Sequence, residues 1–270
     1  MNLSYELIDE NNIKLASSIQ GTIFPGESAS QHYKHSIISN HKNSSYYIIR
    51  WNNIPVGITG IYIMNKYDKQ PINDNSVWLG WFGVLPEFRS KGIGRQALLD
   101  TIEKSKIYKR KYFRIYTVST DNALAQPLYK SIMHAREPYK NKEDYNYNNN
   151  CYIYSYNLKG NNNIELWNNK YAYINEDIEM EKKSNSELNN FYKILINISP
   201  NSKEFNQIIT LATSFREDGH LVTINKKIKN TADYNIVINV EQFLSLIDKY
   251  NSITEIKEYY YNQLREANNG

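Results

Sequence analysis

The sequence predicts an α/β protein built on a mixed, mostly antiparallel sheet with helices on both faces, followed by a second, smaller α/β unit. Two observations carry this prediction. Strand-like and helix-like apolar patterns alternate over residues 1–158 in the order βααβββαβαββ. After them, Gly160-Asn161-Asn162-Asn163 is small, polar and without periodicity, which places a boundary there and divides the chain into residues 1–159 and 160–270.

The elements of the first part follow from their hydrophobic patterns. Residues 77–84 are apolar and aromatic throughout, which is typical of a strand buried on both faces. Asn52-Asn53-Ile54-Pro55 is expected to join two strands as a hairpin-type turn, and the polar stretch 141–150 to be a hairpin loop. Pro127 lies inside an expected helix, so either that helix bends before Tyr129 or its regular part begins close to Pro127. Six of the seven strands in this order have expected bounds, residues 3–9, 46–51, 56–64, 77–84, 112–118 and 151–158, and the seventh precedes the hairpin loop. The expected helices are residues 11–20, 28–39, 92–109 and 121–132.

The elements of the second part are shorter. Asn201-Ser202-Lys203-Glu204 has the pattern of a capping box that opens a helix, and Asp218-Gly219 is typical of its end. We expect the apolar faces of the last helices either to bury a core of their own or to dock onto the first part. The expected strands are residues 164–167, 170–174, 221–225 and 235–240, and the two closing helices are residues 241–249 and 254–267, the second capped by Ser252.

Charge and cysteine content limit the function classes. Lys and Arg exceed Asp and Glu by 19 to 13 in residues 1–158, whereas acidic residues slightly exceed basic ones afterwards. This small, scattered excess suits an anionic small molecule and argues against a nucleic-acid partner. The single cysteine, Cys151, excludes an internal disulfide and is expected to be a strand residue. No stretch is apolar enough to span a membrane, and we expect a cytoplasmic protein.

The most informative segment is the turn that precedes the third expected helix. Residues 84–99 read VLPEFRSKGIGRQALL, a strand end that runs through Pro86 into two glycines and a helix. Gly92 and Gly94 allow a tight turn in which several backbone N–H groups approach one ligand, and the helix dipole favours an anion there. Arg89, Lys91 and Arg95 add positive charge. The alternative is an ordinary helix N-terminus with solvated basic residues.

Two motifs in this region resemble those of the GNAT superfamily of acyl-CoA-dependent N-acetyltransferases. Arg89-Ser90-Lys91-Gly92-Ile93-Gly94, after Val84-Leu85-Pro86, matches the acyl-CoA signature R/Q-x-x-G-x-G/A. Asn122-Ala123-Leu124-Ala125-Gln126-Pro127-Leu128-Tyr129 matches N-x-x-A-x-x-x-Y on the next helix. The resemblance covers about residues 1–158. It departs after the tyrosine, where Ser131-Ile132-Met133-His134 replaces a short G-F sequence.

The resemblance implies an N-acetyltransferase that uses acetyl-CoA as co-substrate and a primary amine as acceptor. The amine attacks the thioester directly, and Tyr129 is the candidate acid for the departing thiolate, because a phenol of pKa about 10 can supply a proton to it. Without the motif, Tyr129 is a half-buried helix aromatic. The residues expected to bind the co-substrate are Val84, Arg89, Lys91, Gly92, Ile93, Gly94, Arg95 and Asn122.

The general base and the acceptor are less well defined. The expected strand 77–84 carries no carboxylate, which leaves Glu27, in a loop expected to border the acceptor site, as the candidate base. The alternative for Glu27 is a loop residue that caps the next helix. His32, His35 and His41 lie close in sequence, but without Cys or paired acids we expect no metal site. Trp78, Trp81 and Phe82 are interpreted as core residues.

Two further questions stay open at this level. Residues 160–270 are expected to fold as an accessory domain that carries no transfer chemistry, so that a chain ending at Leu158 folds and binds acetyl-CoA. A different class of function is a non-catalytic acyl-CoA-binding module that acts on a partner through these C-terminal residues. The identity of the amine acceptor is undetermined, and a homo-oligomer is left open.

Overall fold

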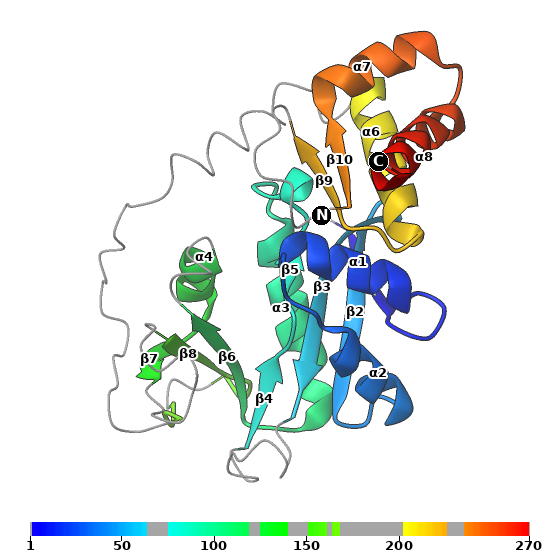
Figure 1. Ribbon diagram of the computed structural model, residues 1–270. Helices are drawn as coiled ribbons and strands as arrows, with labels where there is room; N and C mark the ends of the chain where they lie inside the picture. Colours follow the sequence, from blue (N-terminus) through cyan, green and yellow to red (C-terminus); the bar gives the residue numbers. More distant parts are fainter. Residues whose placement is uncertain are drawn as a thin grey trace.

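The computed structural model describes residues 2–63, 75–118, 125–139, 151–160, 164–167, 202–225 and 235–269. Its larger part is an eight-stranded sheet in the order β1-β2-β3-β4-β6-β8-β7, with β5 paired to β3 (Figure 1). Neighbouring strands are antiparallel except for the parallel pair β4–β6, as far as the described residues extend. The predicted mixed, mostly antiparallel sheet is confirmed. The strands are β1 (Leu3–Leu7), β2 (Ser44–Trp51), β3 (Ile54–Tyr62), β4 (Ser76–Leu79), β5 (Gly83–Val84), β6 (Tyr112–Val118), β7 (Ala135–Tyr139) and β8 (Cys151–Asn157).

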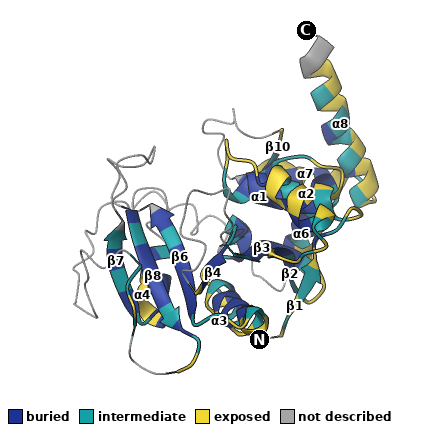
Figure 2. Ribbon diagram, turned by 90° about the horizontal axis from the view of Figure 1, so that it is seen from below, coloured by how far each residue is buried: buried dark blue, intermediate teal, exposed yellow. Residues whose placement is uncertain are grey.

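Helices cover both faces of this sheet, as the apolar periodicities predict. One face is covered by α1 and α2, and the other by α3 and α4 (Figure 1). Seen from below, the central strands are buried, while the outer side of α3 is exposed (Figure 2). The helices are α1 (Ile13–Ile23), α2 (Ser30–Ile38), α3 (Ile93–Ser105) and α4 (Ala125–Ile132).

The predicted continuous strand 77–84 is wrong, because the chain breaks at Gly80. Strand β4 ends at Leu79, and β5 resumes at Gly83 after an unpaired Trp81 and Phe82. A Cβ atom on Gly80 would lie 2.7 Å from Tyr46 Cε1, and one on Gly83 2.5 Å from Ile23 Cγ2. Glycine is therefore required at these two close approaches. Past the break, β5 pairs with β3 and no longer continues the β4–β6 pairing.

The C-terminal residues form a small α/β unit around two parallel strands. Most predicted elements are confirmed within a residue or two, including Ser252 at the start of the last helix, where its hydroxyl accepts from the Glu255 N–H. Residues 164–167 form no strand, and Ser202 caps the first helix by accepting from the Phe205 N–H. The expected elements at 141–150 and 170–174, and Asn201, lie outside the described residues. The observed elements are α6 (Lys203–Glu217), β9 (Val222–Asn225), β10 (Ile236–Asn239), α7 (Val240–Lys249) and α8 (Ile253–Asn269).

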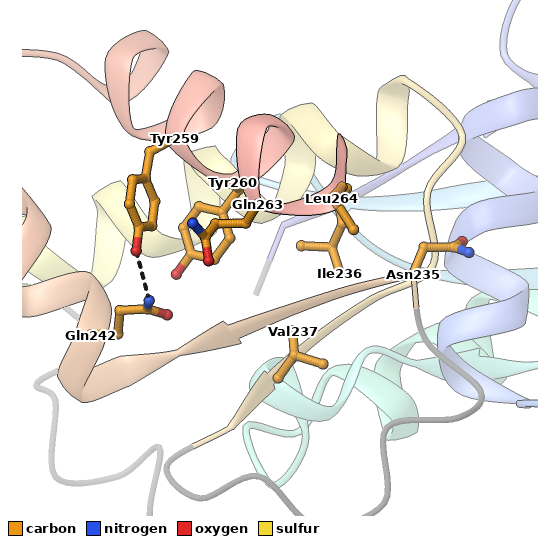
Figure 3. Close-up of a pocket in the computed structure, with 8 residues that line it drawn as sticks. All are labelled: Asn235, Ile236, Val237, Gln242, Tyr259, Tyr260, Gln263 and Leu264. Atoms are coloured by element: carbon orange, nitrogen blue, oxygen red, sulfur yellow. Dashed lines mark hydrogen bonds between the residues drawn. The ribbon is translucent and has the colours of Figure 1, made fainter. Parts of the chain in front are cut away.

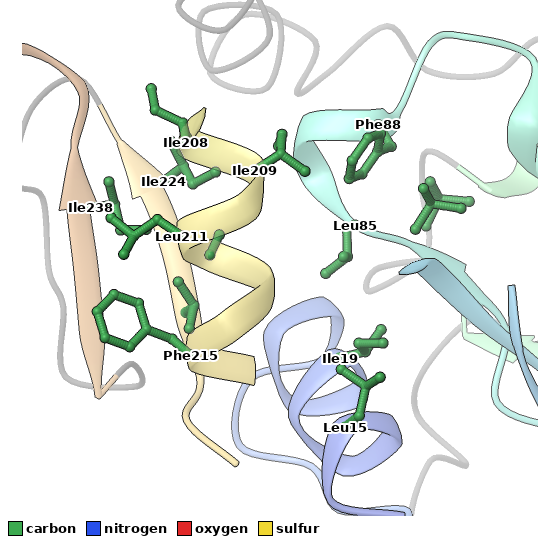
Figure 4. Close-up of a cluster of buried hydrophobic side chains, with 14 of the residues drawn as sticks. Leu15, Ile19, Leu85, Phe88, Ile208, Ile209, Leu211, Phe215, Ile224 and Ile238 are labelled. Atoms are coloured by element: carbon green, nitrogen blue, oxygen red, sulfur yellow. The ribbon is translucent and has the colours of Figure 1, made fainter. Parts of the chain in front are cut away.

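The C-terminal unit docks onto the first part through a common hydrophobic core. Helix α6 lies against α1 and against the turn that follows β5, so that Ile209 of α6 faces Leu85 and Phe88 (Figure 4). Polar contacts accompany this packing: the Val222 N–H donates to Thr22 Oγ1 at 3.4 Å. The last two helices, α7 and α8, pack within the C-terminal unit against β10 and α6, and α6 makes the contact with the first part, so each expected arrangement is observed in a different helix. Whether each part folds alone stays a prediction.

Candidate functional site

The turn between β5 and α3 presents unpaired backbone donors. Gly92, the residue just before the first helical residue of α3, has φ +79°, a left-handed conformation that favours glycine. The first α3 bond runs from the Gln96 N–H to the Gly92 carbonyl at 3.1 Å. Within the described residues, the N–H groups of Ile93, Gly94 and Arg95 therefore have no backbone acceptor, and no side chain caps the helix. Unpaired N–H groups at a helix N-terminus can bind an anion, and the anion site expected here stays a prediction.

Gly94 has no structural explanation in the protein itself. It lies in the first turn of α3 and has no positive φ. An added Cβ would be 3.6 Å from Leu128 Cδ2 and 3.8 Å from Val84 Cγ2, which are ordinary contacts. Glycine in a helix costs about 1 kcal/mol relative to alanine.

The three basic side chains lie around the turn, but each also contacts the protein. Arg89 Nε donates to the Val84 carbonyl at 2.8 Å, which closes the turn across its own strand. Lys91 Nζ lies 5.5 Å from the centre of the Phe205 ring. Arg95, which is exposed, donates from Nη1 to Ser131 Oγ at 2.8 Å and so links α3 to α4. Arg89 and Lys91 lie in the turn and Arg95 in α3; their contacts with Val84, Phe205 and Ser131 were not predicted, and their role around an anion stays a prediction.

Val84 and Ile93 differ from these residues because their side chains belong to the core. Val84 is paired with Gly57 across the sheet, and Ile93 is buried. Either residue can contribute to a ligand site only through its backbone. Asn122, the remaining predicted contact, lies outside the described residues.

Tyr129 is held on α4 close to this turn. Helix α4 contains Pro127 and is described from Ala125 onward. Residues 119–124 lie outside the described residues, so the choice between the two arrangements expected for Pro127 stays a prediction. The Tyr129 ring lies 6.4 Å from that of Phe82 and 5.7 Å from that of Tyr154. Its side chain is 5% exposed, and desolvation, assisted by Tyr154, raises the pKa of its phenol well above the usual value near 10.

Glu27 lies in the loop between α1 and α2 and is exposed. Its N–H donates to the Phe24 carbonyl at 3.2 Å. The Phe24 ring is 5.3 Å from that of Trp81, which in turn is 6.1 Å from the His32 ring. The loop that carries Glu27 therefore lies next to the break between β4 and β5. The residue that precedes α2 is Ala29, and the Ser30 N–H at the start of this helix donates to Ser28 Oγ at 3.4 Å, so the described contacts argue against the capping role considered for Glu27.

The aromatic residues at the break divide into two groups. Trp78 is in the core, as predicted. Trp81 and Phe82 are only partly buried, so their assignment to the core was incomplete. Cys151 is buried on β8, where the predicted strand is confirmed.

Comparison with known proteins identifies the first part of the chain. A model of the acetyltransferase (GNAT) family matches residues 14–134, which include the turn and Tyr129. These residues are a GNAT acetyltransferase domain.

Solved structures of similar fold include several GNAT enzymes. A GNAT-family acetyltransferase from Staphylococcus aureus is 14% identical with a TM-score of 0.44, over 58% of this chain and 99% of that one. The ribosomal-protein-S18-alanine N-acetyltransferase of Escherichia coli is 12% identical with a TM-score of 0.44, over 58% of this chain and 94% of that one. NAA60 of Arabidopsis thaliana in complex with acetyl-CoA is 15% identical with a TM-score of 0.44, over 59% of this chain and 100% of that one. A search of curated proteins finds no match.

A separate cavity of about 200 Å³ lies outside the GNAT domain, between β10 and α8 (Figure 3). Its lining is uncharged, which does not suit a pyrophosphate. Gln242 Nε2 donates to Tyr259 Oη at 3.2 Å across it. The cavity is lined by Asn235, Ile236, Val237, Gln242, Tyr259, Tyr260, Gln263 and Leu264.

In the described part of the chain, no helix is long and apolar enough to cross a membrane.

One contact at the turn was missed by the sequence analysis. Glu87, in a single 3-10 turn (Pro86–Phe88), forms a buried ion pair with Arg216 of α6. The sequence held a signal for it. Arg216 falls on the apolar stripe of α6, where a charge needs a partner. That stripe consists of Phe205, Ile208, Ile209, Ala212 and Arg216.

Proposed function

We propose that the protein transfers an acetyl group from acetyl-CoA to a primary amine. The observation that carries this proposal is the N-terminus of α3 in the GNAT domain, where left-handed Gly92 precedes three unpaired N–H groups and Gly94 leaves the backbone open. Phosphate oxygens satisfy such donors, and the helix dipole favours their charge. The pyrophosphate of acetyl-CoA is the group proposed to bind there, with Arg89, Lys91 and Arg95 around it.

Strand β5 supports binding of the remainder of the co-substrate. One edge of β5 pairs with β3. Strand β6 pairs with β4 and, in the described residues, does not pair with the other edge of β5. On that side the Val84 carbonyl accepts from Arg89 Nε at 2.8 Å, so the main-chain group proposed to bind an extended, amide-bearing ligand is the Val84 N–H. The pantetheine part of acetyl-CoA carries two amides and is proposed to bind along Gly83 and Val84.

The reaction is a direct displacement. The amine nitrogen attacks the thioester carbonyl, a C–N bond forms, and the C–S bond breaks with its electron pair on sulfur. We propose that Tyr129 donates a hydrogen bond to this sulfur as negative charge develops. Because burial raises the pKa of Tyr129, full proton transfer to a thiolate, whose conjugate thiol has a pKa of about 8.5, is uphill, and hydrogen bonding is the better matched role.

The acceptor amine is proposed to enter beside the sheet break. Trp81 and Phe82 there are only partly buried, and the Glu27 loop adjoins Trp81 through Phe24. An exposed carboxylate in this position attracts a protonated amine and can receive its proton, directly or through water. Asn122 keeps its proposed role as a polar contact to the co-substrate. No observation favours a non-catalytic binding module over an enzyme.

Calorimetric titration of the full chain with acetyl-CoA tests the first step. Saturable binding with one site per chain is expected, and absence of binding at millimolar acetyl-CoA contradicts the proposal. A panel of polyamines, amino sugars, aminoglycosides and peptides with free N-termini or lysines then tests transfer, with released thiol as the readout. Acetyl-CoA that binds but is neither hydrolysed nor transferred would support a binding module.

A further inference from the structure

Helix α6 of the C-terminal unit contacts the phosphate-binding turn at both of its ends. At the start of the turn, Arg216 pairs with Glu87. Close to the other end, Lys91 Nζ lies over the Phe205 ring, 5.5 Å from its centre. Phe205 and Arg216 lie toward opposite ends of the same helix. The turn is thus held along the length of α6.

The pair between Glu87 and Arg216 is fully enclosed. Arg216 Nη1 is 2.8 Å from Glu87 Oε1, and the two side chains are 1% and 2% exposed. The second guanidinium nitrogen, Nη2, donates to the Val222 carbonyl at 3.2 Å, which connects β9 to the same pair. A guanidinium can do this because its donors are fixed in a planar fork.

The position of Glu87 makes its neutralisation important for the turn. Only Phe88 separates Glu87 from Arg89, whose Nε closes the turn on the Val84 carbonyl. A buried carboxylate without a partner is strongly destabilising. It would also repel a pyrophosphate bound a few residues further along the chain. Arg216 removes both effects because it supplies a positive charge to Glu87 from helix α6.

Apolar packing fixes the geometry of this contact. Leu85 and Phe88, which flank Glu87 in the chain, face Ile209 of α6 (Figure 4). The carboxylate therefore has a defined position relative to Arg216. A shift of α6 moves the base of the turn, including Arg89.

We propose that Arg216 is a positioning residue that holds the acyl-CoA phosphate turn in its binding conformation through Glu87. The inference rests on the proposed function for its effect on acetyl-CoA. It assigns residues 202–225 a part in cofactor binding without any contact to the acetyl group. The C-terminal unit is then a support of the active site.

The test compares Arg216→Met with Lys257→Met in the full chain. Lys257 pairs with Asp218 at 2.6 Å and contacts the end of α6, but not the turn, so its removal is a matched loss of one cation. Hydrogen exchange without ligand is the first readout. Arg216→Met is expected to speed exchange in a peptide covering residues 88–94, with no change in β6 (Tyr112–Val118). Lys257→Met is expected to leave both segments unchanged.

Binding is the second readout. Arg216→Met is expected to weaken acetyl-CoA binding by about threefold to thirtyfold, the range of coupling through packed networks. Binding of S-acetyl-pantetheine, which lacks the pyrophosphate, should not change. Equal weakening of both ligands, or exchange that rises throughout the protein, assigns Arg216 a general structural role and overturns the proposal.

A double variant keeps the proposal falsifiable where Arg216→Met does not fold. Glu87→Met with Arg216→Met replaces the pair by apolar side chains and removes the buried charge. It is expected to fold and to show exchange at residues 88–94 that is faster than in the wild type, because the hydrogen-bonded link from Val222 through Arg216 to the turn is lost, but slower than in Arg216→Met, because no unpaired carboxylate remains. Wild-type exchange and affinity in this variant would overturn the proposal. A wild-type chain that binds no acetyl-CoA overturns the proposed function instead, while the exchange measurement still tests the support of the turn.

Discussion

The ring of Tyr129 lies 6.4 Å from the ring of Phe82, which joins helix α4 to the break between β4 and β5. Leu128, the preceding residue, lies beside Gly94 at the start of α3. The same turn of α4 therefore faces both the sheet break and the phosphate turn. This places a buried phenol between the two features that the proposed reaction requires.

Tyr129→Phe is expected to lower turnover by roughly 10- to 1,000-fold, because it removes the donor to the leaving sulfur. Affinity for acetyl-CoA should hardly change. Steady-state kinetics with calorimetry measure the two effects separately. Tyr260→Phe is the matched control, since its buried hydroxyl has no hydrogen-bond partner among the described residues, and its turnover should equal that of the wild type. Equal turnover of both variants would assign Tyr129 to packing.

The raised pKa of Tyr129 predicts the alkaline side of the pH profile. A phenol is neutral and able to donate below its pKa, and burial moves that pKa upward. Tyr129 should therefore stay protonated through pH 10, and kcat should rise with pH as the amine loses its proton and then level off. A fall in kcat between pH 8 and about 10 that disappears in Tyr129→Phe would show that the phenol ionises within that range.

Gly94→Ala is expected to separate stability from binding. Its Cβ meets nothing closer than 3.6 Å, and alanine is the better helix former, so the free energy of unfolding should be unchanged or rise by up to about 1 kcal/mol. Acetyl-CoA affinity should fall about tenfold or more, which is 1.4 kcal/mol, because the methyl group obstructs the approach to the backbone. Thermal denaturation and calorimetry provide the two readouts. Unchanged affinity would remove Gly94 from the site.

Gly92→Glu is expected to abolish acetyl-CoA binding through charge repulsion and strain at φ +79°. Gly160→Glu is the control, because Gly160 has φ +76° and an added Cβ there meets no atom of the described residues within 4 Å. The two variants carry the same new charge and comparable backbone strain of about 1–2 kcal/mol. Only the first should lose binding. Normal binding by Gly92→Glu would show that this turn is not the phosphate site.

The sequence predicts the main part of the fold because its signals are local. Periodicity identifies most helices and strands, and the glycine-bracketed turn identifies the start of α3. The break in residues 77–84 was missed although Gly80 and Gly83 are visible in the sequence. Their meaning depends on Tyr46 and Ile23, which approach them only in the folded protein.

The site is predicted less completely for the same reason. The unpaired N–H groups follow from the helix start, so the position of the anion site is predictable. The partners of the basic residues are not, since Lys91 meets Phe205 and Glu87 meets Arg216 across more than a hundred residues. A local pattern indicates that Arg216 is buried, but it does not indicate which carboxylate it meets.

The shared core changes the expectation for a chain that ends at Leu158. Such a chain lacks α6 and exposes the apolar side chains that face it, including Leu85 and Phe88 (Figure 4). Apolar patches of this kind promote association, and the Val222 and Arg216 contacts with Thr22 and Glu87 disappear with them.

We expect this shortened chain to be less stable than the full chain and to bind acetyl-CoA more than about tenfold more weakly. Thermal denaturation, size-exclusion chromatography and calorimetry test the expectation. The control is the shortened chain mixed with a separately expressed chain of residues 160–270. Recovery of binding in the mixture would locate the missing support in the C-terminal unit. A shortened chain that is monomeric, folded and within tenfold of full affinity would establish residues 1–159 as an independent domain and contradict a role for α6 in the site.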